Sequence, residues 1–139
     1  MKTIMRVAAT AGLAWVHGAL AEPNMHPGLW ETTVRTEMSG MPMQMPPVTH
    51  RQCIRKQDLV PQVASSDQEC RIVDQNTEGN SVSWRIQCDS SDMQMEGSGK
   101  LTYAGDSYRG RIDIQTQDGP MGAMTMVQKL EGRRVGDCP

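Results

Sequence analysis

Apolar and polar residues alternate along much of the chain, with the period of two that is typical of half-buried β-strands. The clearest example is segment 29–38, where the odd-numbered positions are mostly charged or hydroxyl-bearing. The even-numbered positions form the other face and carry Trp30, Thr32, Val34, Thr36 and Met38. We therefore predict a strand that turns this second face towards a core.

The same alternation returns at regular intervals and predicts six further strands. They are expected at residues 48–54, 70–77, 81–88, 92–103, 107–117 and 122–132. Turns rich in Gly, Asn and Asp separate most of them. Beyond the first 21 residues, the pattern allows at most one short helix, a single turn at residues 56–60 before Pro61.

Seven strands joined mostly by short turns predict a single small all-β domain. We expect an antiparallel meander that curls into a barrel-like or half-barrel sheet, because an open flat sheet would leave long exposed edges. A two-sheet sandwich is the main alternative. Gly97 and Gly99 lie inside a predicted strand, where they suggest a bulge or bend that curves the sheet.

The first 21 residues have the three parts of a cleaved secretory signal. Lys2 and Arg6 supply positive charge, residues 7–16 are apolar, and Ala19-Leu20-Ala21 is a small-residue cleavage motif. A cytosolic N-terminal helix is the alternative interpretation. We expect residues 1–21 to be removed on export to the periplasm or the extracellular space. Residues 22–139 then form one domain without a membrane span.

The composition narrows the function classes. The formal net charge is −2 and no block of Lys or Arg occurs, so the chain lacks the basic surface that nucleic-acid binding requires. Phenylalanine is absent, whereas methionine occurs 12 times. Methionine, valine, isoleucine and leucine must therefore fill the core, and cross-links would help so small a domain.

Four cysteines occur after the predicted signal: Cys53, Cys70, Cys88 and Cys138. An even number in a small exported domain predicts two disulfides, and the absence of a C-x-x-C motif argues against zinc or redox chemistry. Three pairings are possible in principle.

A probable hairpin favours one of these pairings. If residues 78–80 form a three-residue turn, Thr77 faces Ser81, and counting outwards places Cys70 opposite Cys88. The remaining bond would then join Cys53 to Cys138. A turn shifted by one residue would change this register.

A methionine- and proline-rich segment follows the first strand. Thioether sulfur is a soft ligand that favours Cu(I), and the candidate metal ligands are Met38, Met41, Met43, Met45 and His50. Shorter echoes of the pattern occur at 93–95 and 124–126. The alternative is that these methionines fill the core or fold over an open end of the sheet.

A binding module is the other non-catalytic possibility. A curved sheet lined by aliphatic residues, with Trp30 and Trp84, could bind a small apolar ligand or offer a surface to an envelope protein. Both tryptophans could equally anchor a filled core.

Catalysis has little support in the sequence. The candidate reactive groups are His26, His50, Asp89 and Asp92, and no nucleophile elbow or strand–loop–helix unit accompanies them. An acidic cluster beside serines is more typical of a solvated loop. We assign no catalytic residue.

Ordered motifs along the chain resemble domain-of-unknown-function family 3617, whose members are small exported bacterial proteins. The motifs are PGLWETTV (27–34), MSGMPMQMPP (38–47), THRQCI (49–54), GNSVSWRIQC (79–88), GSGKLTYAGDSYRG (97–110) and GDC (136–138). The resemblance implies an exported, disulfide-containing β domain and brings no activity or substrate. We therefore expect a non-catalytic binding or structural module without a cofactor, with Cu(I) binding as the alternative.

Overall fold

The computed structural model describes residues 22–41, 43–61, 69–89, 94–117 and 122–139. In this part of the chain seven strands form one antiparallel sheet, and there is no helix. The strands are β1 (Gly28–Met38), β2 (Val48–Ile54), β3 (Glu69–Glu78), β4 (Ser81–Asp89), β5 (Gln94–Tyr103), β6 (Ser107–Gln117) and β7 (Met124–Gly136). The predicted all-β fold of a single domain is confirmed.

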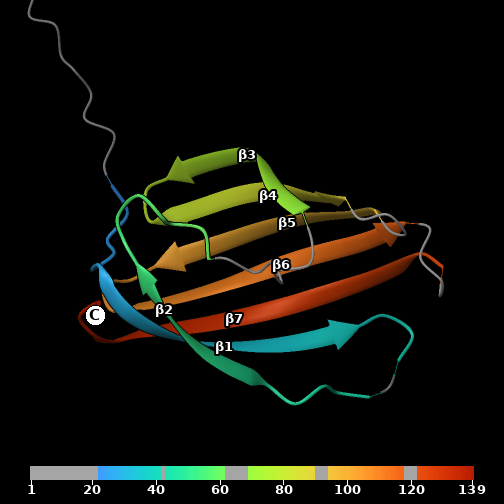
Figure 1. The fold of residues 1–139 in the computed structure, drawn as a ribbon, viewed down its shortest axis with the longest axis horizontal. Helices are drawn as coiled ribbons and strands as arrows, with labels where there is room; N and C mark the ends of the chain where they lie inside the picture. Colours follow the sequence, from blue (N-terminus) through green and yellow to red (C-terminus); the bar gives the residue numbers. More distant parts are fainter. Residues whose placement is uncertain (1–21, 42, 62–68, 90–93, 118–121) are drawn as a thin grey trace, which may run out of the picture.

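The order of the strands across the sheet is β2-β1-β7-β6-β5-β4-β3. Strands β3 to β7 follow one another as a meander, and β1 adds to β7, so the two ends of the domain share a ladder (Figure 1). The sheet does not close into a barrel because its edge strands, β2 and β3, do not pair with each other. The alternative of a two-sheet sandwich is wrong for the described residues.

The side chains of Trp30, Tyr103 and Tyr108 form the centre of the core. Trp30 stacks on Tyr108 with ring centroids 5.4 Å apart, and Tyr103 meets both rings edge-on. We call the sheet face that carries Trp30 the inner face and the opposite, polar face the outer face. The core therefore lies on one side of a single curved sheet.

The segment after β2 covers the core at this end of the sheet. Residues 56–57 form a turn, in which the Asp58 N–H donates to the Arg55 carbonyl at 2.9 Å, and the helical turn expected at 56–60 is absent. Pro61 cannot continue a helix, and the extended path lets Leu59 pack on the core. The Leu59 carbonyl also accepts the Tyr103 hydroxyl at 2.7 Å.

The expected bulge at Gly97 and Gly99 is absent. The pairing of β5 with β4 and with β6 keeps one register through both glycines. Gly99 instead makes room for a side chain, because a Cβ at this position would overlap the Trp84 ring that crosses over it from β4. Close packing of an aromatic ring, and not a bulge, explains the glycine.

Two disulfides lie at opposite edges of the sheet. Cys70 is joined to Cys88 between β3 and β4, and Cys53 of β2 is joined to Cys138 after β7. These are the pairs expected from the predicted hairpin. In the part of the chain that the structure describes, no helix could cross a membrane.

Candidate functional site

The burial of apolar side chains on the inner face decreases from one end of the strands to the other. At one end the inner face is closed by the aromatic core, with Trp30, Leu101 and Tyr103 at most 1% exposed. At the other end, where β1 ends and β7 begins, the apolar side chains are only partly buried. Apolar side chains at this end of the inner face are therefore partly accessible to a ligand.

Strand register shows which side chains share this partly buried end. Met38 pairs with Met126, which pairs with Ile114, and the row continues to Ile86 on β4. The next row contains Met124 and Met95, which flank Thr116. We call the four side chains Met38, Met95, Met124 and Met126 the methionine strip.

The rows of the inner face end in exposed apolar residues at both edges of the sheet. Val48 on β2 is 63% exposed and Ile72 on β3 is 50% exposed. Ile72 lies in the same row as Ile86 and Met126. Ile72 therefore extends the row of the methionine strip to the sheet edge, whereas Val48 pairs with Val34, in a row nearer the core.

Trp84 lies beside this strip with an unpaired polar group. Its side chain is 2% exposed, and its buried indole Nε1 has no hydrogen-bond partner among the described residues. Trp30, by contrast, donates its Nε1–H to the His26 carbonyl at 3.1 Å. A buried N–H without an acceptor costs about 1–3 kcal/mol of stability. A bound ligand that supplies an acceptor to Trp84 would remove this cost.

The two tryptophans predicted to bind a ligand therefore differ. Trp30 belongs to the packed aromatic core, where its ring and its N–H are both engaged. Trp84 sits on the row between the core and the methionine strip, opposite Gly99. Of the two, Trp84 retains a free hydrogen-bond donor.

The β1–β2 loop carries the other predicted metal ligands. Its exposed methionines are Met41 at 44%, Met43 at 79% and Met45 at 49%. The loop leaves the tip of β1 and turns back to β2, which pairs with β1 (Figure 1). It thus begins beside Met38, at the same end of the sheet as the methionine strip.

His50 does not belong to this group. It pairs with Thr32, six residues along β1 from Met38, a separation of about 20 Å at the usual rise per strand residue. His50 and Met38 therefore do not lie side by side, while metal binding by the loop methionines stays a prediction. His50 was included among the predicted ligands because it is close to the loop in sequence. The pairing of β2 with β1 places it opposite Thr32, far from Met38.

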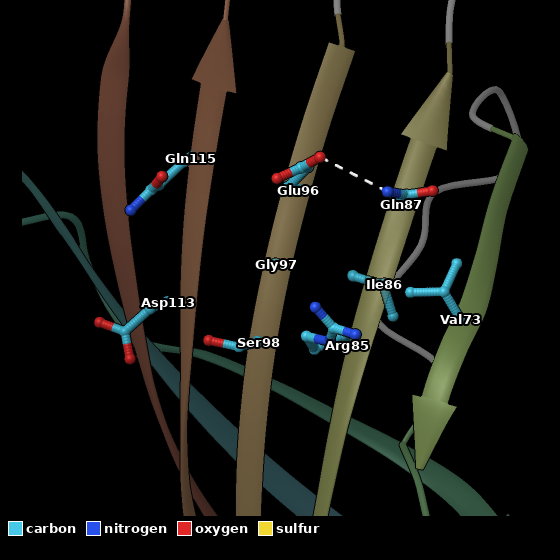
Figure 2. A pocket seen from close by; sticks show the side chains of 9 residues that line it. All are labelled: Val73, Arg85, Ile86, Gln87, Glu96, Gly97, Ser98, Asp113 and Gln115. Carbon is cyan, nitrogen blue, oxygen red and sulfur yellow. Dashed lines mark hydrogen bonds between the residues drawn. The ribbon is translucent and has the colours of Figure 1, made fainter.

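The outer face is polar and bears a shallow depression of about 250 Å³. Figure 2 shows the residues that line it on neighbouring strands: Arg85, Ile86 and Gln87 of β4, Glu96, Gly97 and Ser98 of β5, Asp113 and Gln115 of β6, and Val73 of β3. The charged groups already have partners. Gln87 donates to Glu96 at 3.4 Å, and Arg85 lies 3.6 Å from Asp74.

Ion pairs occupy the rest of the outer face as well. Glu31 accepts hydrogen bonds from Arg133 at 2.6 Å and from Arg51 at 3.0 Å, and these bonds lower the pKa of its carboxyl. Arg111 similarly lowers the pKa of Asp113. A second depression of about 570 Å³ adjoins the Glu31 cluster. These paired surface charges are typical of a solvated face.

The candidate catalytic residues are not brought together. His26 contacts Asp106 at 2.9 Å on the surface, His50 lies on edge strand β2, and Asp89 is exposed at the end of β4. Asp92 lies outside the described residues. Within those residues, no group of three His, Cys, Asp or Glu side chains could hold a metal ion.

Sequence reasoning missed two features of the inner face. The unpaired Nε1 of Trp84 depends on packing against β5, for which the sequence has no signal. The Met38–Met126 pair depends on the addition of β1 to β7; the Met-x-Met pattern at 124–126 was noted, but only the topology places it beside the β1–β2 loop.

Comparison with known proteins gives one match. The model of the family described as "Protein of unknown function (DUF3617)" matches residues 25–138. No curated protein and no solved structure matches.

Proposed function

The chain belongs to the DUF3617 family, and we propose that it is an exported, non-catalytic module that binds a small apolar ligand on its inner face. The N-terminal signal pattern supports export, and the two disulfides are compatible with an oxidising compartment. The observation that carries the binding proposal is the buried, unpaired Nε1–H of Trp84.

The chemistry of the face defines the ligand class. Ile86, Met95 and Met126 offer flexible, partly buried apolar contacts beside the core, and thioether side chains adapt to ligands of different shape. The Trp84 N–H supplies one directed donor. The ligand is therefore an apolar chain or ring that carries a hydrogen-bond acceptor such as a carbonyl, ether or hydroxyl oxygen.

The arrangement of the potential catalytic groups also favours a binding role over catalysis. The histidines and carboxylates of the described residues are dispersed or engaged in surface ion pairs. A reaction would need a nucleophile or base held in a dry site. The inner face instead offers apolar contacts, the Trp84 N–H and the uncharged polar side chains of Thr36 and Gln128.

The test is a titration of the exported protein with dansyl-undecanoic acid, followed through the fluorescence of the probe. Trp84→Phe keeps the aromatic ring and removes the N–H, and it should weaken binding about twofold to tenfold, the worth of one hydrogen bond. Met95→Gln should weaken binding because it places an amide on the apolar strip.

Val127→Gln is the matched control. Val127 is next to Met126 in sequence but lies on the outer face of β7, opposite Glu37, so its variant should bind the probe like the parent. Absence of binding by the parent, or equal binding by all the variants, would contradict the proposal. A structural role or contact with an envelope protein would then be the better explanation.

A further inference from the structure

Among the sulfur-containing side chains of the domain, the methionines are the candidate ligands for a soft metal ion. All four cysteines form disulfides, so there is no free thiol to compete for a soft metal ion. Thioethers are then the softest ligands that the chain offers, and Cu(I) prefers them to carboxylates. A soft-metal site in this protein therefore has to be sought where methionines converge.

Strand register places three methionines near one another on the inner face where β1 meets β7. Met38 lies directly opposite Met126, and such pairs have Cβ atoms about 4.5–5.5 Å apart. Met124 is two residues before Met126 and on the same face, about 7 Å along the strand. Three long, flexible side chains with this spacing can bring their sulfur atoms to one point.

A fourth methionine is tethered close to these three. The Ser39 N–H donates to the Thr125 carbonyl at 3.0 Å, and the Thr125 N–H donates back to the Ser39 hydroxyl at 3.3 Å. This anchor fixes the start of the β1–β2 loop to β7, between Met124 and Met126. Met41 follows two residues later, within about 8 Å of Ser39 along the chain, and is 44% exposed.

We propose that Met38, Met124 and Met126 form a site for one Cu(I) ion, with Met41 as the loop ligand that completes it. The site lies between β1, β7 and the loop and shares Met126 with the proposed apolar site, which is centred on Trp84 of β4. It does not include His50. Neither proposal requires the other, and different substitutions separate them.

The test is a competition between the exported protein and a colorimetric Cu(I) chelator, with Ag(I) as a redox-stable second probe and native mass spectrometry for stoichiometry. The parent should bind one ion. Met38→Leu/Met124→Leu/Met126→Leu should lose affinity by at least the roughly tenfold to hundredfold that follows changes around metal ligands. Leucine has a similar volume, so the fold should survive; near-ultraviolet circular dichroism verifies this.

Two variants serve as controls. His50→Ala should bind like the parent because His50 lies about 20 Å away along β1. Trp84→Phe should also retain the metal, even though it weakens binding of the apolar probe. Equal Cu(I) binding by the triple-leucine variant, or loss of binding in His50→Ala, would overturn the proposed ligand set.

Discussion

The hydroxyl groups of Thr32 and Tyr108 lie 2.5 Å apart inside the core, although the two residues belong to β1 and β6 with β7 between them. Both side chains are buried, at 0% and 2% exposure. The residue of β7 that pairs with both is Gly132. The Tyr108 ring lies across this glycine, which is how its hydroxyl reaches Thr32.

A double-mutant cycle should show that this pair is coupled. Thr32→Val keeps the shape of the side chain and leaves the Tyr108 hydroxyl without its partner in the core. Tyr108→Phe leaves the Thr32 hydroxyl in the same position. Each single change should destabilise the fold by about 1–3 kcal/mol, the cost of an unpaired buried polar group. Urea denaturation of the exported protein measures the free energy of unfolding.

The double variant is the decisive measurement. Replacing both partners by apolar groups of the same shape removes the unpaired group as well as the bond. The double variant should therefore be more stable than the sum of the single effects implies. Strictly additive effects would mean that the two hydroxyls do not depend on each other.

Gly132→Ala should destabilise the fold by about 1–3 kcal/mol, the usual cost of overpacking a core. A Cβ at Gly132 would overlap the Tyr108 ring and push its hydroxyl away from Thr32. Gly136→Ala is the matched control on the same strand, since a Cβ there meets nothing within 4 Å. Similar stability of the two variants, measured by thermal unfolding, would be inconsistent with this packing.

The two tyrosines of the chain should resist ionisation until the protein unfolds. Burial raises the pKa of Tyr103, with a smaller contribution from Tyr108, and burial also raises the pKa of Tyr108 against the opposing bond from Thr32. Because the folded pKa exceeds the unfolded value of about 10, the neutral tyrosines contribute stability that is fully present below pH 10. This contribution declines as the pH rises further.

Tyrosinate absorbance and far-ultraviolet circular dichroism measure this dependence together. Both signals should change in one transition above pH 10, since the chain contains only two tyrosines and both are buried. Ionisation at the ordinary pKa with an intact circular dichroism spectrum would show that the core admits hydroxide or opens locally.

The strands could be predicted from alternation, but the cysteine pairing in one hairpin was correct for the wrong reason. The turn contains Gly79 and Asn80 alone, so Thr77 pairs with Val82 and not with Ser81. A bulge at Val73 then adds one residue to β3 and restores Cys70 opposite Cys88. The two errors cancel, and neither the shorter turn nor the bulge has a signal in the pattern of apolar residues.

The site was less accessible to sequence reasoning because it depends on long-range pairing. The methionine-rich loop was recognised from composition, and its start does lie beside Met38. Met126 joins it only because β1 adds to β7, and His50 leaves it because β2 runs back along β1. Periodicity assigns a residue to one face of the sheet, whereas strand order and register decide which residues are neighbours on that face.

The two disulfides should contribute unequally to stability. The Cys53–Cys138 bond spans 85 residues and the Cys70–Cys88 bond spans 18. If cross-links act by restricting the unfolded chain, their contributions are about 4.6 and about 3.2 kcal/mol at 25 °C. Replacing Cys53 and Cys138 by alanine should therefore lower the free energy of unfolding by about 1.4 kcal/mol more than replacing Cys70 and Cys88.

Urea denaturation of the two paired-alanine variants tests this difference and its cause. Loss of the longer cross-link lets the unfolded chain expand further, so the dependence of the unfolding free energy on urea should steepen more in Cys53→Ala/Cys138→Ala. The Cys70–Cys88 bond joins two adjacent strands, where hydrogen bonds already hold the pairing. A larger loss of stability in Cys70→Ala/Cys88→Ala would mean that packing of the 4%-exposed Cys88 outweighs restriction of the unfolded chain.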